Sequence, residues 1–326
     1  MPDALTALAD LGLQISAADS FPFRGIRFLD RGKTAAADFP AGPGRGVRRT
    51  TLHRMMTEHA ESVGVKLNWG AHVDFNALRC GWIVGADGEN SLVRKWAGLD
   101  MRLRDRSRFG FRRHYQIEPW TDRMELYWGD GYQVYVTPVT PDSMCVAAIS
   151  RDSQFRLDDA LGGLPELAVR LSPSVILTGE RGAVSSSRRL KAVYRDRVAL
   201  VGDASGSVDA ITGEGLRLAF RQAIALAEAI ERGDLEAYAS QHRQIARRPE
   251  WMAKLLLTLG DHARVRHAAM SALGAFPQIF AKMLALHVQA KRPGDNAAIV
   301  EEDDFEHEPA MSPSASERSI VLSRNF

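Results

Sequence analysis

Two aspartates in this chain each follow a short apolar segment and a glycine, an arrangement that suits the binding of a polar ligand. Asp203 follows the apolar residues 198–201 and Gly202, and Asp87 follows residues 82–86, which include a glycine. The carboxyl ends of parallel strands share one edge of a sheet, and open α/β sheets bind their ligands there. A carboxylate at that edge can accept hydrogen bonds from two hydroxyl groups of a sugar or polyol. Either segment alone could be an ordinary turn with a solvated aspartate, but the two together predict that Asp87 and Asp203 converge on one ligand.

A glycine-containing loop lies shortly after Asp203 and directly before a long predicted helix. Gly213 and Gly215 flank Glu214, and the helix is expected over residues 216–231. The two glycines leave room for a planar ligand to approach the backbone. A helix start carries partial positive charge and free N–H groups. It would therefore stabilise the negative charge that a flavin ring gains when it is reduced by a hydride.

The hydrophobic pattern predicts the elements that must position these residues. Short strands are expected at residues 25–29 and 34–39, and a helix at residues 50–63. Residues 107–150 are rich in β-formers separated by Gly, Pro and Asp, which indicates an inserted antiparallel sheet. The chain is thus predicted to form an α/β fold with four parts: a nucleotide-binding domain (1–100 and 192–232), a β-rich substrate domain (101–191), a C-terminal helical region (233–292) and a disordered acidic and polar tail (293–326).

The composition argues against several classes of protein and several kinds of site. The chain has 326 residues, 45% apolar and 25% charged, and a formal net charge of +2, which is too mild to indicate nucleic-acid binding. Cys80 and Cys145 are the only cysteines, too few for a disulfide framework or a thiolate zinc site. We find no apolar run of membrane-spanning length and no signal peptide, so a cytoplasmic location is expected. His53 and His59 share a helix without nearby acids, and no metal site is predicted.

The two strand–Gly–Asp segments resemble the second and third FAD-binding motifs of flavin-dependent oxidoreductases with the hydroxylase-type fold, over about residues 1–290. Within that group, residues 212–215 and the lack of a His-Pro pair after Asp203 are more similar to geranylgeranyl-reductase-type flavoproteins than to aromatic hydroxylases. The resemblance implies that Asp203 binds the ribitol of FAD and that residues 213–215 lie beside the isoalloxazine. It also implies that residues 87–88 lie near the pyrophosphate and that Arg49 reaches the flavin. Arg48 competes for that role, and Arg49 could equally be a solvated arginine at a helix start. The implied cofactor-binding residues are Arg49, Asp87, Gly88, Gly202, Asp203, Gly213, Glu214 and Gly215.

One part of the pattern expected from this resemblance is missing. Such enzymes begin with a strand, a Gly-x-Gly-x-x-Gly turn and a helix, and residues 42–46 are a poor substitute because of their proline and the lack of a preceding apolar strand. The Rossmann-like domain is therefore predicted to be incomplete, through an N-terminal shortening. The strands near Val84 and Val201 would then lack a neighbour, and FAD binding by this chain alone should be weak.

The function that this resemblance implies is an FAD-dependent oxidoreductase. A reductase or dehydrogenase acting on an apolar small molecule, such as a prenyl compound, is the first expectation, with NAD(P)H as a candidate electron donor. The alternatives are an FAD-dependent monooxygenase and a non-catalytic remnant or split half that needs a partner. No side chain stands out as a general acid or base, and the oligomeric state is left open.

Two basic regions have competing interpretations. Arg102, Arg104, Arg106 and Arg108 alternate along an extended segment and could attract an anionic substrate or the phosphate of NADPH, although a solvated strand edge is the commoner explanation. The C-terminal helices combine basic and apolar residues. They could lie on a membrane surface, although ordinary amphipathic packing is more common.

Overall fold

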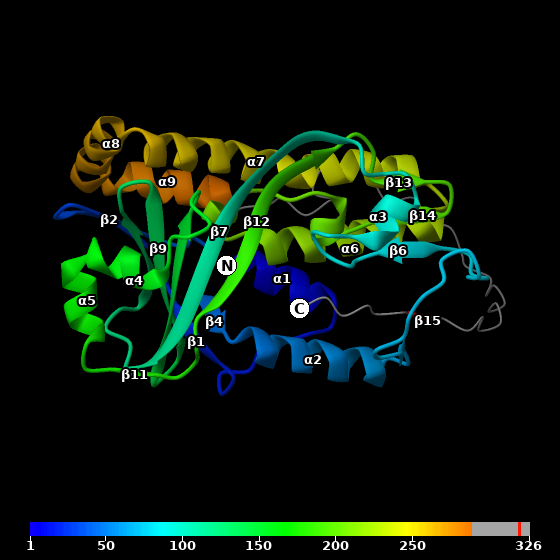
Figure 1. The fold of residues 1–326 in the computed structure, drawn as a ribbon, viewed down its shortest axis with the longest axis horizontal. Coiled ribbons are helices and arrows are strands. Elements are labelled where there is room, and N and C mark those ends of the chain that lie inside the picture. Colours follow the sequence, from blue (N-terminus) through cyan, green and yellow to red (C-terminus); the bar gives the residue numbers. More distant parts are fainter. Residues whose placement is uncertain (289–318, 321–326) are drawn as a thin grey trace, which may run out of the picture.

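The computed structural model describes residues 1–288 and 319–320 and shows a large sheet beside a smaller one (Figure 1). The predicted disordered tail, residues 293–326, lies outside the described residues except for the short strand β15 (Ser319–Ile320), which pairs with β5 (Lys66–Leu67). The mixture of helices and sheets confirms the predicted α/β class.

The large sheet has eight strands in the order β11–β7–β10–β9–β8–β2–β3, and β12 also pairs with β7. All pairs are antiparallel except β2 with β8. The structure differs here from the predicted domain boundary, since β2 and β3 belong to this sheet and not to the nucleotide-binding part. The strands are β2 (Gly25–Asp30), β3 (Lys33–Asp38), β7 (Arg102–Gln116), β8 (Arg123–Trp128), β9 (Tyr132–Thr140), β10 (Ser143–Ser150), β11 (Val175–Ile176) and β12 (Arg181–Leu190).

Helices cover parts of both faces of the large sheet because its strands alternate apolar side chains between the faces. On one face, Val134, Val136, Met144 and Val146 pack against α4 (Leu157–Gly162) and α5 (Pro165–Leu171). The two helices are separate because the chain leaves the helical conformation around Gly163 and a new helix begins at Pro165, a favoured first residue of a helix.

The opposite face of the same sheet packs against the C-terminal helices. Phe28, Leu126 and Trp128 contact this helical layer, in which Phe280 lies 4.8 Å from the Phe28 ring centroid. No single helix in residues 1–288 has the length and apolar character of a membrane span; α8 and α9 reach that character only together, and they are bent by 104°. The layer consists of α7 (Leu235–Asp261), α8 (Ala263–Ala275) and α9 (Pro277–Val288).

The smaller sheet holds the two predicted strand–Gly–Asp segments. Its order is β13–β14–β6, with β14 (Val198–Leu200) parallel to β6 (Ile83–Gly85) and antiparallel to β13 (Tyr194–Arg195). Residues of α6 (Gly215–Arg232) and α7 cover one face, and α3 (Leu92–Trp96) covers the other. Among the described strands none pairs with the outer edge of β6, where the Val84 side chain is 43% exposed.

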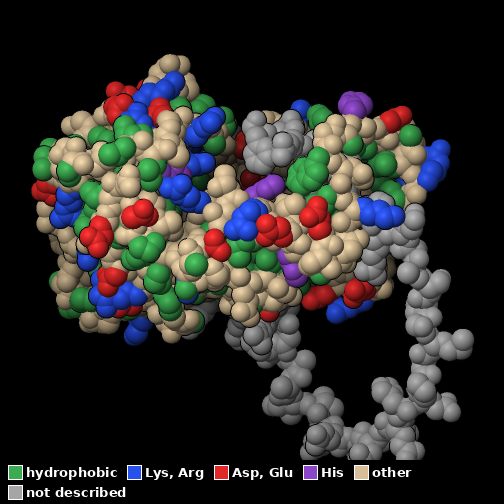
Figure 2. All heavy atoms as spheres, turned by 90° about the horizontal axis from the view of Figure 1, so that it is seen from below, with side chains coloured by type: hydrophobic (Ala, Val, Ile, Leu, Met, Phe, Trp, Pro, Cys, Tyr) green, Lys and Arg blue, Asp and Glu red, His purple; other side chains and the backbone are tan. Residues whose placement is uncertain are grey.

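The remaining elements complete the region between the two sheets. Helix α1 (Pro2–Asp10) packs on α6, and β1 (Ser20–Phe23) pairs with β4 (Gly44–Val47), which leads directly into α2 (Arg49–Ser62). The predicted helices at residues 50–63 and 216–231 are thus confirmed as α2 and α6. Basic and acidic side chains are interspersed on the face seen from below (Figure 2).

Candidate functional site

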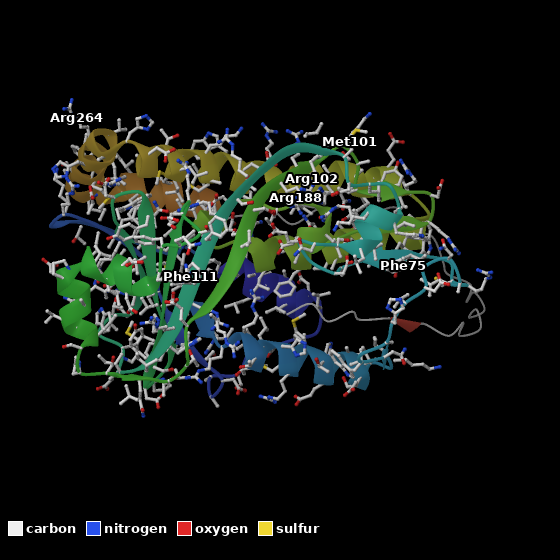
Figure 3. The ribbon with its side chains drawn as sticks, viewed as in Figure 1. Phe75, Met101, Arg102, Phe111, Arg188 and Arg264 are labelled. Atoms are coloured by element: carbon white, nitrogen blue, oxygen red, sulfur yellow. The ribbon has the colours of Figure 1, made fainter. Side chains whose placement is uncertain are left out.

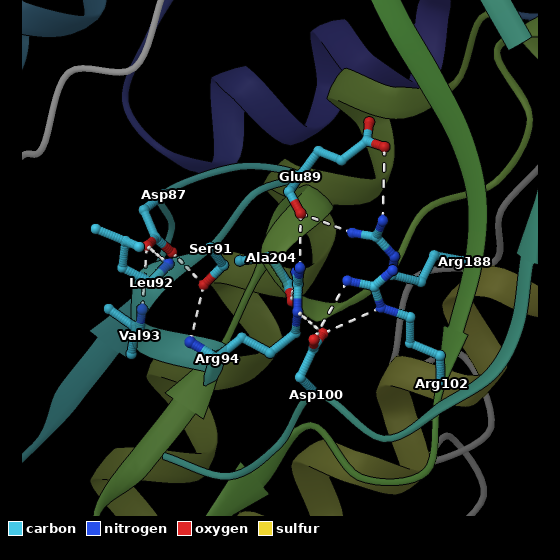
Figure 4. A network of polar contacts seen from close by, with 10 residues as sticks. All are labelled: Asp87, Glu89, Ser91, Leu92, Val93, Arg94, Asp100, Arg102, Arg188 and Ala204. Carbon is cyan, nitrogen blue, oxygen red and sulfur yellow. Dashed lines mark hydrogen bonds and ion pairs between the residues drawn. The ribbon is translucent and has the colours of Figure 1, made fainter. Parts of the chain in front are cut away.

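The loops that follow β6 and β14 lie side by side. Gly85 is paired with Leu200, and the Val201 N–H donates to the Gly85 carbonyl oxygen at 2.9 Å. Arg94, fully buried, joins the two loops by donating to the Glu89 carbonyl oxygen at 2.6 Å and to the Ala204 carbonyl oxygen at 3.0 Å (Figure 4). The two segments therefore meet at one edge of the sheet, as the sequence predicted.

The Asp87 carboxylate is occupied within its own loop. One oxygen accepts from the Ser91 hydroxyl at 2.5 Å, and the other accepts from the backbone N–H groups of Leu92 at 2.6 Å and Val93 at 3.2 Å (Figure 4). This is the bonding of an aspartate that stabilises the start of a helix, here α3. The acidic side chain that acts electrostatically on Asp203 is instead Glu89. The role of Asp87 near a pyrophosphate stays a prediction.

Asp203 and Arg49 form the open part of the site. Both residues are exposed to solvent, and within residues 1–288 neither side chain makes a hydrogen bond. Surrounding protein nevertheless acts on them: partial desolvation and the Glu89 carboxylate raise the pKa of Asp203, while Arg49 and Arg188 lower it. Desolvation likewise lowers the pKa of Arg49, and Asp203 opposes that change. A cation and a carboxylate without other partners are suited to bind a ligand that carries hydroxyl and anionic groups.

The predicted glycines around Asp203 have no side chain to cover their backbone. Gly88, Gly202 and Gly213 have φ values of 75°, 58° and 67°, a left-handed conformation that favours glycine. A Cβ atom at Gly213 or Gly215 would meet no atom within 4 Å, so the backbone at the start of α6 is open. This geometry fits a flat ring lying against the helix start.

Glu214 differs from its neighbours because its side chain points into the protein. It is 2% exposed, and its Oε1 accepts from the Arg217 guanidinium at 2.8 Å. Burial raises the pKa of Glu214 to about 7, and Arg217 opposes the shift. Its Oε2 lies 3.7 Å from Nδ1 of His287 in α9. Only the backbone of Glu214 can therefore lie beside a ligand in the open region; its predicted place next to a flavin is otherwise untested.

A buried polar network fixes the loop that carries Asp203. Gln222 of α6 accepts from the Gly202 N–H at 2.8 Å, and His242 of α7 lies 2.8 Å from the Ser205 hydroxyl and 3.1 Å from the Gln222 amide nitrogen. Burial lowers the pKa of His242 to about 4, so its imidazole is neutral at pH 7. The network thus holds both ends of residues 202–205 without placing a charge beneath Asp203.

Three side chains on the large sheet were not predicted as site residues. Arg112 and His114 share one face of β7, and Cys145 of β10 is paired with His114. The charge of Arg112 affects the pKa of Arg49, and the charge of Arg48 affects the pKa values of His114 and Cys145. This face of the sheet therefore lies near the start of α2. We call Arg112, His114 and Cys145 the polar face. Their two-residue spacing was the available signal, but it could not say which face of the strand was covered.

The polar face carries positive charge but no reactive base or thiolate. Burial, with Arg112 and Arg48 nearby, lowers the pKa of His114 to about 4, so that His114 is neutral at pH 7. Burial raises the pKa of Cys145 to about 11, which keeps it as a thiol. The buried Nε of Arg48 has no hydrogen-bond partner among the residues described. This face can therefore orient an anionic or hydroxyl-bearing molecule.

Arg108 joins the large sheet to the loop before α6. Its guanidinium donates to Asp209 at 3.1 Å and to the Ile149 carbonyl oxygen at 3.1 Å, and it also contacts Gln133. The expectation of a solvated strand edge is wrong for Arg108, which is 4% exposed, whereas Arg102 and Arg106 are exposed. In the described chain no group of three or more His, Cys, Asp or Glu residues could hold a metal ion.

Comparisons with known proteins agree with this architecture. A dialkyldecalin synthase of Streptomyces rugosporus is 25% identical over 241 residues, which are 64% of this chain and 50% of that protein. The chain thus spans about half the length of this curated relative.

Solved structures show the same fold at lower sequence identity. A triple mutant of the flavin-dependent brominase Bmp2 is 18% identical, with a TM-score of 0.72 over 89% of this chain and 84% of its own. The p-nitrophenol 4-monooxygenase PnpA of Pseudomonas putida is 17% identical, with a TM-score of 0.71 over 88% and 87%. HpxO of Klebsiella pneumoniae, solved with FAD and uric acid, is 17% identical, with a TM-score of 0.67 over 88% and 86%.

The family described as FAD binding domain matches residues 47–248, which include α2, both strand–Gly–Asp segments and all of α6. FAD, the cofactor that the resemblance implied, is thereby confirmed, and this chain belongs to the FAD binding domain family.

Proposed function

We propose that this chain works as an FAD-dependent oxidoreductase, and specifically as a monooxygenase of a small anionic or hydroxyl-bearing substrate. The observation that carries the proposal is the polar face lying toward Arg49, with the cations Arg112 and Arg48 around a neutral His114. A prenyl chain would gain little from two cations, whereas a phenolate or carboxylate gains charge-assisted hydrogen bonds.

Each part of the site has a distinct role in this proposal. FAD supplies the redox chemistry when it is bound. Asp203 accepts hydrogen bonds from its hydroxyl chain, and Arg49 offers donors on the same side. Gly213 and Gly215 let the ring approach the start of α6, whose N–H groups stabilise negative charge. The side chains of the polar face then orient the substrate.

The solved relatives support a monooxygenase at least as well as a reductase. PnpA is named as a monooxygenase of p-nitrophenol, and HpxO was solved in complex with uric acid; both compounds are small acidic rings. The fold likeness does not carry these substrates over to this chain, but it makes such compounds the natural first set to test.

The test measures oxygen uptake and product formation by the FAD-loaded chain with NADPH and a panel of small phenols and carboxylates. Arg112→Met should raise KM about tenfold, since it removes a charged hydrogen-bond donor, and should change kcat less. Arg113→Met is the matched control, because Arg113 points to the opposite face and binds Asp158 at 2.6 Å. Equal effects of the two variants, or substrate reduction without oxygen uptake, would contradict the proposal.

A reductase acting on an apolar, geranylgeranyl-type substrate at a membrane surface is the second candidate. The observation in its favour is exposed apolar residues on α8 and α9, with Val265 next to Arg264 at the start of α8 and Phe276 and Ile279 at the α8–α9 bend; Lys282 follows on α9. Sedimentation with anionic vesicles would distinguish it, since the monooxygenase proposal requires no vesicle binding. A cytoplasmic location is part of the first proposal only.

A third candidate is a chain that binds FAD well only together with a partner. The observation in its favour is the β6 edge, where the Val84 side chain is 43% exposed and none of the described strands pairs. This chain purified alone should then be colourless and should bind added FAD weakly. Stoichiometric flavin in the purified chain would refute this candidate and leave the first two.

A further inference from the structure

A second cavity lies outside the Arg49–Asp203 region, between the end of β12, the loop of residues 202–206, α6 and α7. Its volume is about 540 Å³, which is in the range of small-molecule sites. Figure 3 labels Arg188, which lies on its wall.

The rim of this cavity is mainly cationic, although the lining also includes the carboxylate of Glu250 on α7. Arg189 and Lys191 come from the end of β12 and the following loop, and Arg243 and Arg247 lie one turn apart on α7. All four residues are exposed, and within the described chain none of their side chains makes a hydrogen bond or an ion pair. These four cations outnumber the two carboxylates of the lining, Glu236 and Glu250, so an anionic ligand between them would be stabilised.

The deeper part of the cavity is neutral and polar. Its lining includes Ser205, Gln222 and His242, and the low pKa of His242, about 4, keeps its imidazole uncharged at pH 7. Tyr194 adds a half-buried aromatic surface, and Glu236 adds a carboxylate. An aromatic ring can stack on a base, and a carboxylate can accept from ribose hydroxyls, as acidic residues do in dinucleotide sites.

We infer that this cavity binds a nucleoside phosphate, with the phosphate between the rim cations and the nucleoside against Tyr194 and Glu236. The shared chemistry is that of a phosphorylated ribonucleoside, whether it comes as a free nucleotide or as the adenylate half of NADPH. The inference does not depend on the proposed monooxygenase activity, because none of the rim cations belongs to the polar face or to the Arg49–Asp203 pair. Arg188 connects the two regions, since it lines the cavity and also acts electrostatically on Asp203.

The test is a binding titration of the full chain by calorimetry with NADPH, ATP and inorganic phosphate as separate probes. The double variant Arg243→Gln/Arg247→Gln should weaken nucleotide binding about tenfold, because each partly exposed ion pair contributes about threefold. Arg264→Gln is the matched control: Arg264 is an exposed arginine on α8, well separated from Arg188 in Figure 3, and should leave binding unchanged. Binding should also weaken as salt is raised.

The three probes distinguish the sources of the phosphate. Tighter binding of NADPH than of ATP assigns the cavity to the reductant, and equal binding of the two assigns it to nucleotides in general. Inorganic phosphate that binds as tightly as either nucleotide overturns the nucleoside assignment. Absence of saturable nucleotide binding at millimolar concentrations, or a double variant that binds within about twofold of the wild type, overturns the site itself.

Discussion

Replacing Arg108 by methionine should destabilise the protein because it leaves a buried carboxylate without its cation. Arg108 and Asp209 are 4% and 3% exposed, and the guanidinium donates to the Asp209 carboxylate at 3.1 Å. Breaking a buried ion pair by removing one partner costs about 3–5 kcal/mol. Asp209 still accepts from the Ile211 N–H at 3.0 Å, so we expect the lower end of that range, about 3 kcal/mol.

The measurement is urea unfolding at pH 7.5, followed by tryptophan fluorescence. Arg106→Met is the matched control, because Arg106 lies on the same strand and is exposed, and its free energy of unfolding should change by less than about 0.5 kcal/mol. Asp209→Asn added to Arg108→Met should restore about 1–2 kcal/mol, since it removes the orphaned charge.

The same variant should also affect the cofactor region. Asp209 is the residue before the short helix η2 (Ala210–Thr212), which leads to Gly213. If Asp209 is no longer held in place, the loop that we propose to lie beside FAD should become more mobile. We therefore expect weaker FAD binding in Arg108→Met. A loss of less than about 1 kcal/mol, or a second substitution that only adds to the damage, would refute the role assigned to this pair.

Three further predictions concern stability. Gly46→Ala would place a Cβ atom 1.8 Å from a backbone carbonyl oxygen of β9 and should cost at least about 2 kcal/mol, whereas Gly81→Ala, with no atom within 4 Å, should be nearly neutral in thermal unfolding. Burial lowers the pKa of His242 to about 4 in the folded protein, so the unfolded chain takes up the proton first as the pH falls below about 6.5. Between pH 7 and pH 5 the free energy of unfolding of the wild type should therefore fall by about 2 kcal/mol more than that of His242→Asn. Equal pH dependence of the two proteins would contradict this. Arg266→Met should cost about 3 kcal/mol in urea unfolding by orphaning Asp30, which is 2% exposed and accepts from Arg266 at 3.1 Å; a cost within the error of the measurement would show that the pair contributes nothing.

The sequence by itself determined the local features of this protein. Residues 198–203 are an apolar run, a glycine and an aspartate, and that order alone predicted a parallel strand that ends at a binding edge. The open backbone at Gly213 and Gly215 also followed from the residue types, since only glycine lacks a Cβ. These features depend on neighbours within a few positions, and hydrophobic periodicity and backbone freedom are encoded at that range.

Only the tertiary structure decided which polar side chains are available to a ligand. Asp87 and Asp203 follow similar segments, yet the Asp87 carboxylate is hydrogen-bonded to the start of α3 while the Asp203 side chain remains accessible to a ligand. Arg108 and Arg112 lie on the same strand, yet Arg108 is buried against Asp209 and Arg112 lies on the partly exposed polar face. For Arg108 the distinction depends on a contact with Asp209, 101 positions away, whereas Asp87 is bound by residues only 4 to 6 positions further along the chain. Alternation along a strand gives two faces but does not say what covers each of them.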